Sequence, residues 1–276
     1  MLQRVAEKLD YMTEPIDRLS GEQIQHYHEQ GYLSVEAITT SEEVGELIGL
    51  YDELFVSGAG AEDGYQFDLT SSDKTGEERD LPQVIFPSKY QPRFLETRLF
   101  STASTVATQL LGENAEFFFD HAIFKPARHG APTPWHQDEA YHDPAFEHQT
   151  LDIWVPLQDV DERNGCMHFV PGSHRSEITP HQPVGGDPLI RALEAVGFDP
   201  DQHEIVSCPL AAGGATVHDF RTLHYTPPNR SDRPRRAYIM AFALPKVPRK
   251  VRRRFPWREE QNAAHRAQES TENHLP

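Results

Sequence analysis

The stretch PWHQD at residues 134–138 contains residue types that could bind a metal ion. His136 and Asp138 are two positions apart, so on an extended segment both side chains would point to one ion while Gln137 points away. His136 is the only one of the fifteen histidines that is followed two positions later by an acidic residue. A second histidine would complete the two-histidine, one-carboxylate set that leaves positions open for ferrous-iron oxygen chemistry.

Four later histidines compete for that place: His168, His203, His218 and His224. His224 is favoured because a TPPN turn comes after it, and then Arg235 and Arg236 at the start of an apolar strand. A buried arginine is costly unless an anion meets it, and its planar fork matches a carboxylate. The alternative is that both arginines reach solvent or pair with one of the 43 acidic residues.

The elements before residue 112 are expected to be mainly helical. Ser20 and Gln23 form a capping-box pattern that starts a helix, Gly31 ends it, and a short strand is expected next, at 32–36. A second amphipathic helix is predicted to begin at Thr40 or Ser41, and a further helical stretch at 91–111. Residues 57–80 are rich in Gly, Ser and Asp, which predicts a mobile loop.

From residue 115 onward the pattern changes to short runs of β-branched and aromatic residues separated by turn residues. The runs lie at 115–126, 151–160, 166–173, 203–210, 214–220 and 235–244. Such a series favours an antiparallel sandwich or barrel over a parallel α/β sheet. Residues 175–203 interrupt the series as an insertion, which is expected to be partly helical around 187–197.

Composition indicates one globular domain over residues 1–276, with a helical part at 14–111, a β core at 115–244 and a basic segment and tail at 245–276. We expect a cytoplasmic protein that does not enter a membrane, because no apolar run approaches a membrane span and the N-terminus is charged. Both cysteines are predicted to be buried and unpaired. The net charge of −17 disfavours nucleic-acid binding.

The run KVPRKVRRRFPWR at 246–258 opposes this acidic balance. We interpret it as a solvated segment that neutralises the acidic body or serves a subunit contact, with contact to a negatively charged substrate as the alternative. The tail after it is expected to be frayed or loosely helical.

Three blocks together resemble the phytanoyl-CoA dioxygenase family of iron(II)- and 2-oxoglutarate-dependent oxygenases. They are PWHQD, LDIWVPLQDVDERNGCMHFVPGSH and GGATVHDFRTLHYTPPNRSDRPRRA, within a resemblance that spans residues 15–245. The resemblance implies a mainly β fold with flanking helices, a double-stranded β-helix or jelly-roll barrel. It also implies Fe(II) and 2-oxoglutarate as cofactors, O2 as co-substrate, and a small-molecule substrate oxidised with release of succinate and CO2.

The resemblance assigns roles to six residues. His136, Asp138 and His224 would be the iron ligands. Arg235 would pair with the distal carboxylate of 2-oxoglutarate, helped by Thr226, with Trp154 lining the pocket; Arg236 replaces Arg235 if the strand register differs by one.

The resemblance also bears on the reaction and on turn residues. Family members that halogenate have Gly or Ala in place of the ligand carboxylate, so Asp138 predicts hydroxylation or a related oxidation. Gly165 and the PGSH of 171–174 are expected to be structural, with Ser173 and His174 closing a loop by hydrogen bonds.

Residues next to the predicted ligands are candidates for substrate contact: Tyr141, His142, Phe124 and, in the loop, Tyr65 and Phe67. Each could equally be ordinary packing. The chain is expected to act as a monomer or homodimer.

Two other functions remain open from the sequence. A cupin-like metalloenzyme could use the same ligands with zinc or manganese for hydrolysis or isomerisation, and would leave Arg235 without a partner. A non-catalytic binding module on a barrel scaffold would have no need of the three ligands.

Overall fold

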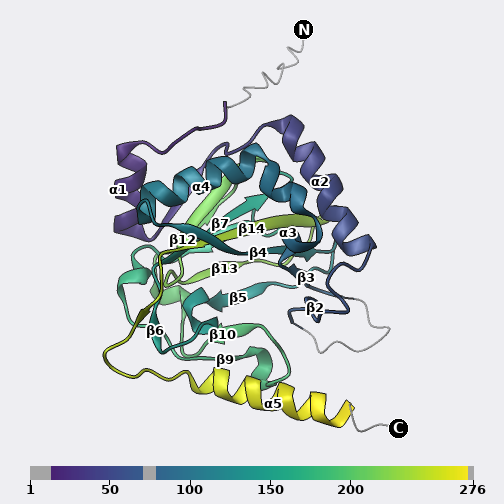
Figure 1. Cartoon of the computed structure of the whole chain (residues 1–276), viewed down its shortest axis with the longest axis vertical. Helices are drawn as coiled ribbons and strands as arrows, with labels where there is room; N and C mark the ends of the chain where they lie inside the picture. The colour runs from purple at the N-terminus through teal and green to yellow at the C-terminus, as the bar shows by residue number, and fades with distance from the viewer. Residues whose placement is uncertain (1–13, 71–78, 273–276) are drawn as a thin grey trace, which may run out of the picture.

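Two antiparallel sheets form the centre of the chain, in a computed structural model that describes residues 14–70 and 79–272 (Figure 1). The larger sheet has seven strands in the order β1-β12-β7-β14-β4-β3-β2, and the smaller has four in the order β11-β8-β13-β5. The larger sheet contains β1 (Tyr32–Val35), β2 (Gln66–Asp68), β3 (Pro82–Ile85), β4 (Glu116–Lys125), β7 (Thr150–Pro156), β12 (Ala215–Asp219) and β14 (Arg235–Ala243). The smaller contains β5 (Thr133–His136), β8 (Met167–Phe169), β11 (Val206–Cys208) and β13 (His224–Thr226). Strands β4, β7, β8, β11, β12 and β14 fall within the predicted runs to within one residue, whereas β2 and β3 lie in a part of the chain where no strand was predicted.

Helices cover the outer face of the larger sheet (Figure 1). They are α1 (Gly21–Gln30), α2 (Ser41–Val56), the short α3 (Pro87–Tyr90) and α4 (Arg98–Leu111), with a 3₁₀ turn η1 (Pro92–Glu96) before α4. The predicted capping box at the start of α1 is present, because Ser20 and Gln23 each accept the other's backbone N–H with their side chains. Gly31 ends α1 in the left-handed conformation, and Thr40 caps α2. The Glu43 carboxylate of α2 also accepts the first two backbone N–H groups of α4 at 2.7 and 2.8 Å.

Strand alternation divides the larger sheet into two chemically different faces. On β14, Tyr238 and Met240 belong to a helix-side core that also contains Leu47 of α2 and Val106 of α4. Their neighbour Ile239, with Trp154, Met167 and Phe169, instead forms a core between the two sheets. Arg235 has the same parity as Ile239, so its side chain points between the sheets, where a ligand site can be enclosed.

Arg236 has the opposite parity and joins the sheet to the helices. Its guanidinium donates to both carboxylate oxygens of Asp52 on α2, at 2.6 and 2.8 Å. It also lies 5.8 Å from the ring centroid of Phe124, its register partner on β4. The two adjacent arginines therefore have different environments, and it is Arg235 that lies inside.

The insertion at 175–203 corrects one prediction. Instead of a helix around 187–197, the chain forms a two-stranded sheet of β9 (His181–Pro183) and β10 (Leu193–Ala195). Two left-handed glycines, Gly185 and Gly186, make the reversal between these strands. Leu193 is buried against Ala140, Phe255 and Trp257, so a contact distant in sequence satisfies the apolar residues that suggested a helix.

The predicted loop at 57–80 is only partly irregular. It contains β2, which pairs with β3, while residues 71–78 lie outside the described residues. The prediction of its mobility stays a prediction.

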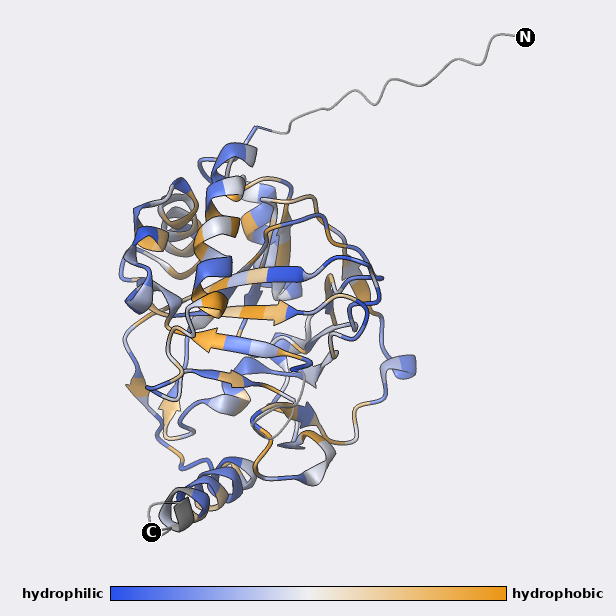
Figure 2. Cartoon of the chain, turned by 90° about the vertical axis from the view of Figure 1, so that its right-hand side faces the viewer, coloured by the Kyte–Doolittle hydropathy of each residue, from blue (hydrophilic) through white to orange (hydrophobic). Residues whose placement is uncertain are grey.

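The basic segment is also not simply solvated. It contributes β15 (Val247–Pro248), which pairs with β6 (Phe146–Glu147), and then two buried aromatic residues, Phe255 and Trp257. The chain continues as α5 (Pro256–Glu272), at the opposite end of the molecule from α1, α2 and α4 (Figure 1). Apolar residues concentrate on the central strands, whereas α5 is largely hydrophilic (Figure 2).

Several smaller expectations agree with the structure. Cys166 and Cys208 are buried and unpaired. The Ser173 hydroxyl donates to the Val170 carbonyl and accepts the Leu223 N–H, and His174 bonds the His28 carbonyl, so both close the PGSH loop. Among the described residues, none of the helices has both the length and the apolar character needed to cross a membrane.

Gly165 provides a test of the turn before β8. It has φ +98°, and a Cβ there would lie 3.0 Å from the Pro227 carbonyl oxygen and 3.4 Å from Lys125 Cδ. We expect Gly165→Ala to lower the free energy of unfolding by about 1–3 kcal/mol, measured by urea denaturation followed by circular dichroism. Gly21→Ala is the matched control, since no atom lies within 4 Å of its added Cβ; equal loss in both variants would contradict the prediction.

Candidate functional site

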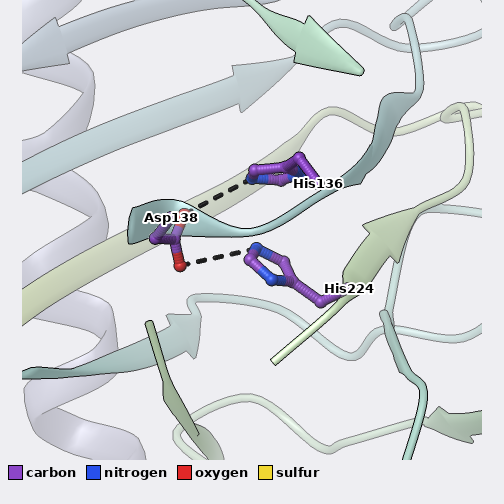
Figure 3. A group of neighbouring side chains, drawn as sticks. All are labelled: His136, Asp138 and His224. Atoms are coloured by element: carbon purple, nitrogen blue, oxygen red, sulfur yellow. Dashed lines mark ion pairs between the residues drawn. The ribbon is translucent and has the colours of Figure 1, made fainter. Parts of the chain in front are cut away.

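His136, Asp138 and His224 meet between the two sheets (Figure 3). Strands β5 and β13 are antiparallel neighbours, and their register places His224 directly opposite His136. The Nε2 atom of His136 lies 3.4 Å from one Asp138 carboxylate oxygen, and Nε2 of His224 lies 3.7 Å from the other. One ligand atom from each of the three residues lies within 4.8 Å of the others, which is close enough for all three to hold one ion.

Hydrogen bonds fix which nitrogen each imidazole offers. Nδ1 of His136 lies 2.7 Å from the Pro134 carbonyl, and Nδ1 of His224 lies 2.9 Å from the Thr222 carbonyl. A carbonyl can only accept, so both Nδ1 atoms carry a proton, and Nε2 is the nitrogen that each imidazole can offer to an ion. Burial, with His136 alongside, lowers the pKa of His224 well below its usual value and keeps it neutral. Two imidazole nitrogens and a carboxylate fit a divalent iron ion.

Gln137 points away from the ligands, as the alternation predicted, and holds the segment in place. Its amide nitrogen donates to the Arg221 carbonyl at 2.6 Å, and its amide oxygen accepts the Thr179 N–H at 2.8 Å. Its own backbone N–H donates to Nε2 of His181 at 3.1 Å. The ligand segment is therefore fixed on its outer side before the 3₁₀ turn η2 (Asp138–Tyr141) begins.

His218 also reaches the site, from the larger sheet. Its Nε2 lies 3.1 Å from the Asp138 carboxylate, on the oxygen that faces His224. Asp152, its register partner on β7, completes a second possible metal-binding group with Asp138 and His218. Burial and the Asp138 charge raise the pKa of Asp152 well above its usual value.

Sequence reasoning placed His218 among four competing histidines and did not foresee this supporting role. The signal was strand alternation. Ala215 and Val217 of β12 pack on the helix side, so His218 points between the two sheets. His168 and His203 lie outside the site, where His168 packs on Tyr225 and His203 stacks on Phe198.

The inner end of the site is a narrow pocket closed by Arg235. This pocket is lined by the three predicted ligands, by Trp154, Thr226 and Arg235, and by further residues of both sheets. Arg235 is 1% exposed, its guanidinium lies 5.6 Å from the Trp154 ring, and one bond of 3.2 Å to the Ile123 carbonyl is its hydrogen bond within the described residues. Its Nε is buried without a partner, and burial lowers its pKa to about 10. A buried cation with free donors indicates a place for an anion.

Lys125 was not identified from the sequence, although it lies opposite Arg235 in the register of β4 and β14. It is fully buried, and its ammonium donates to the carbonyls of Thr226 and Pro227 at 3.2 and 2.8 Å. Burial and the Arg235 charge lower its pKa well below the usual value. By donating to these two carbonyls, Lys125 also fixes the strand that carries Thr226.

A larger cavity of about 570 Å³ opens in front of the ligands. Tyr141 and His142 line it, as predicted, and so does Phe67 of β2. Phe124 does not: its strand parity turns it to the helix side, where it packs on Phe55, and this corrects its proposed contact with substrate. Tyr65 packs on Phe86 and is not part of the cavity wall.

Phe119, His121 and Ile123 line the cavity from β4 instead of Phe124, and His121 is the polar residue among these three. Burial lowers its pKa to about 4, so it is neutral at physiological pH, and its Nδ1 lies 3.3 Å from the Gln83 amide oxygen. Alternation along β4 would have identified His121 if the sequence had shown which alternate residues of the strand face the cavity.

Glu139 comes directly after the ligand Asp138 and is fully buried. Its carboxylate pairs with Arg249 at 3.0 Å and with Arg253, while Arg221 lies 3.8 Å away. The basic segment is thus attached by ion pairs to the residue next to a predicted ligand.

Known proteins are similar to this chain in sequence and in fold. A family model described as Phytanoyl-CoA dioxygenase (PhyH) matches residues 27–237. The chain is 28% identical over 229 residues to the "Probable alpha-ketoglutarate-dependent hypophosphite dioxygenase" of Stutzerimonas stutzeri, covering 80% of this chain and 78% of that protein.

Solved structures show the same fold. EvdO2 from Micromonospora carbonacea var. aurantiaca, crystallised with 2-oxoglutarate, is similar at a TM-score of 0.75 and 36% identity over 87% of this chain and 96% of that chain. The non-heme alpha ketoglutarate dependent epimerase SnoN from nogalamycin biosynthesis is similar at a TM-score of 0.61 and 25% identity, covering 81% and 82%. The predicted fold class, a mainly β double-stranded β-helix with flanking helices, is confirmed.

Glu139→Gln tests the connection between the basic segment and the ligand segment. Removing the buried carboxylate leaves two arginines without their counter-ion. The energetic cost of this loss is partly offset because both arginines reach some solvent. We expect a loss of roughly 2–3 kcal/mol in the free energy of unfolding, measured by urea denaturation. Glu259→Gln, which removes the exposed pair with Arg254, is the control and should cost less than about 1 kcal/mol; equal costs would contradict a buried anchor.

Proposed function

The chain belongs to the phytanoyl-CoA dioxygenase family, and from this premise we propose that it is an Fe(II)- and 2-oxoglutarate-dependent dioxygenase that hydroxylates a small molecule. One observation carries the proposal. The same narrow pocket has two imidazole nitrogens and a carboxylate at one end and, at the other, the guanidinium of Arg235, whose Nε is buried without a partner.

His136, Asp138 and His224 would hold the iron through two Nε2 atoms and a carboxylate oxygen. His218 orients Asp138 through its bond to the carboxylate, so the carboxylate is held in place before an ion arrives. Because Asp138 is present, no ligand position is left open for a halide, and hydroxylation is the expected reaction.

Arg235 would bind one carboxylate of 2-oxoglutarate and turn the other end of the cosubstrate toward the ligands. Thr226 lines the same pocket, and its hydroxyl is 3.0 Å from that of Thr133, which gives the pocket a polar side. Trp154 supports the guanidinium with its ring face, and Lys125 fixes the strand behind Thr226.

When bound, iron with 2-oxoglutarate and O2 supplies oxidative decarboxylation, in which O2 ends as one oxygen of succinate and one hydroxyl oxygen of the product, and CO2 leaves. The protein positions the substrate C–H and excludes water. The substrate would enter from the larger cavity, which shares His136 and Asp138 with the inner pocket.

Two alternatives explain the inner pocket less well. A zinc or manganese hydrolase on the same ligands gives no reason to bury Arg235 with free donors. A binding module needs neither the tautomers set by Pro134 and Thr222 nor the oriented Asp138.

The adjacent arginines allow a matched test of cosubstrate binding. Arg235→Gln removes charge-assisted hydrogen bonds to a carboxylate, so 2-oxoglutarate should bind about 100-fold more weakly or worse. Arg236→Gln, one position away, removes only the pair with Asp52 and should leave this affinity within about threefold. The measurements are the visible charge-transfer absorption of the anaerobic iron complex and iron-dependent succinate formation, and similar losses in both variants would contradict the proposed role.

The ligand set is tested with two histidines on neighbouring strands. His224→Ala removes an imidazole from the metal group, and we expect at least about a 100-fold loss of ferrous-iron affinity in anaerobic titration. His168→Ala removes a histidine next to β13 that points away from the site and should bind iron like the unaltered protein. Tight iron binding by the His224 variant would refute the assignment.

A further inference from the structure

The outer part of the large cavity carries positive charge although the chain has a net charge of −17. Among the described residues, the acidic side chains of its wall are Asp138 and Asp152, and both belong to the metal end. Two arginines, Arg191 and Arg258, line the outer part. The electrostatic potential there therefore favours an anion.

Arg258 is fixed in place without being neutralised. Its guanidinium donates to the Gln261 amide oxygen at 3.0 Å, and no carboxylate forms an ion pair with it within the part of the chain described. Gln261 is itself 1% exposed and donates to the Ile190 carbonyl at 2.8 Å. An uncharged amide thus orients Arg258 while most of its donors stay available. Burial lowers the pKa of Arg258, yet an arginine stays charged at neutral pH.

The other arginines of this segment show the contrast. Arg249 and Arg253 pair with Glu139, and Arg254 pairs with Glu259. Arg258 is the arginine of α5 that lines the large cavity. It also lines a second cavity of about 460 Å³, together with Arg252.

Arg191 approaches from the insertion. Its guanidinium lies 4.4 Å from the ring centroid of Phe67, and no ion pair with it occurs among the described residues. Stacking on an aromatic face leaves the edge of a guanidinium free to bind an anion. Gln261 also donates to the Arg191 carbonyl, at 3.3 Å, so the two arginine-bearing segments are tied together.

The walls between these cations and the metal ligands are mainly aromatic. Phe86, Phe118, Phe119 and Phe220 line the cavity with Phe67. Such walls favour a flat or apolar body of substantial size.

We propose that the substrate is an elongated molecule with an aromatic or other apolar body and one anionic group, and that Arg258, with Arg191, binds that group as the specificity determinant. This inference rests on the proposed function, because it takes the large cavity to be the substrate site. Carboxylate, sulfate, sulfonate and phosphate groups share the required chemistry, since each offers oxygens to a planar guanidinium.

Two near-isosteric probes test it: 1-naphthalenesulfonate, an anion, and 1-naphthalenesulfonamide, which is neutral at pH 7. Binding is measured by calorimetry on the full chain loaded with ferrous iron and 2-oxoglutarate under argon. The unaltered protein should bind the sulfonate at least about tenfold more tightly, and the preference should shrink as salt is added.

Arg258→Gln should remove this preference by weakening the sulfonate about tenfold while leaving the sulfonamide within about twofold. Arg258→Lys should retain part of it, because the charge remains and the fork is lost. Arg128→Gln removes an equal charge from an exposed pair with Asp232 and should behave like the unaltered protein.

Equal affinities for the two probes, failure of both to bind, or a preference unchanged in Arg258→Gln would each overturn the inference. The charge-transfer absorption of the iron complex with 2-oxoglutarate is recorded on the same samples. If that absorption forms while the probes show no charge preference, the substrate inference fails and the proposed oxygenase function stands. If the absorption does not form, the proposed function fails.

Discussion

The antiparallel pairing of β13 with β5 is the constraint on which the site depends. It sets His224 opposite His136. The register then shifts between His224 and Thr226, so Thr226 pairs with Thr133 and not with the residue that regular pairing would place opposite it. In a sheet, a slip of one residue turns every side chain to the other face. Such a slip would place Tyr225, which stacks on Trp135 on the outer face, where His224 now lies. Two short strands thus determine whether the imidazoles converge.

Buried charged side chains differ in how many partners the protein gives them, and this difference separates structural groups from a group that can bind a ligand. Glu139 has two arginines and Lys125 has two carbonyls. Arg235 has a single carbonyl for its five donors, with Nε unpartnered. Since an unmatched buried charge is costly, folding retains it only where binding supplies the missing partner.

Local patterns in the sequence predicted much of this arrangement, because the physics that they report is local. The Ser20 capping box, the alternation of His136 and Asp138, and the strand runs all depend on residues within a few positions of one another. Phe124 was misplaced because its direction depends on which face of β4 meets the helices, and that is decided by pairing with β14. The strand β10 was taken for a helix for a similar reason: Leu193 packs against Phe255 and Trp257, more than sixty positions further along the chain.

The C-terminal segment connects the proposed metal pocket with the outer cavity. The match to the family model ends at residue 237, before the segment that pairs with Glu139 and continues into α5. Glu139 lies next to a proposed iron ligand, whereas Arg258 lies in the outer cavity, so the segment joins the metal pocket to the outer wall through buried contacts. Fold alone does not determine the reaction, as the relatives described as a hypophosphite dioxygenase and an epimerase illustrate. Changes in α5 can alter the outer wall while the ion pairs at Glu139 keep the ligand segment in place.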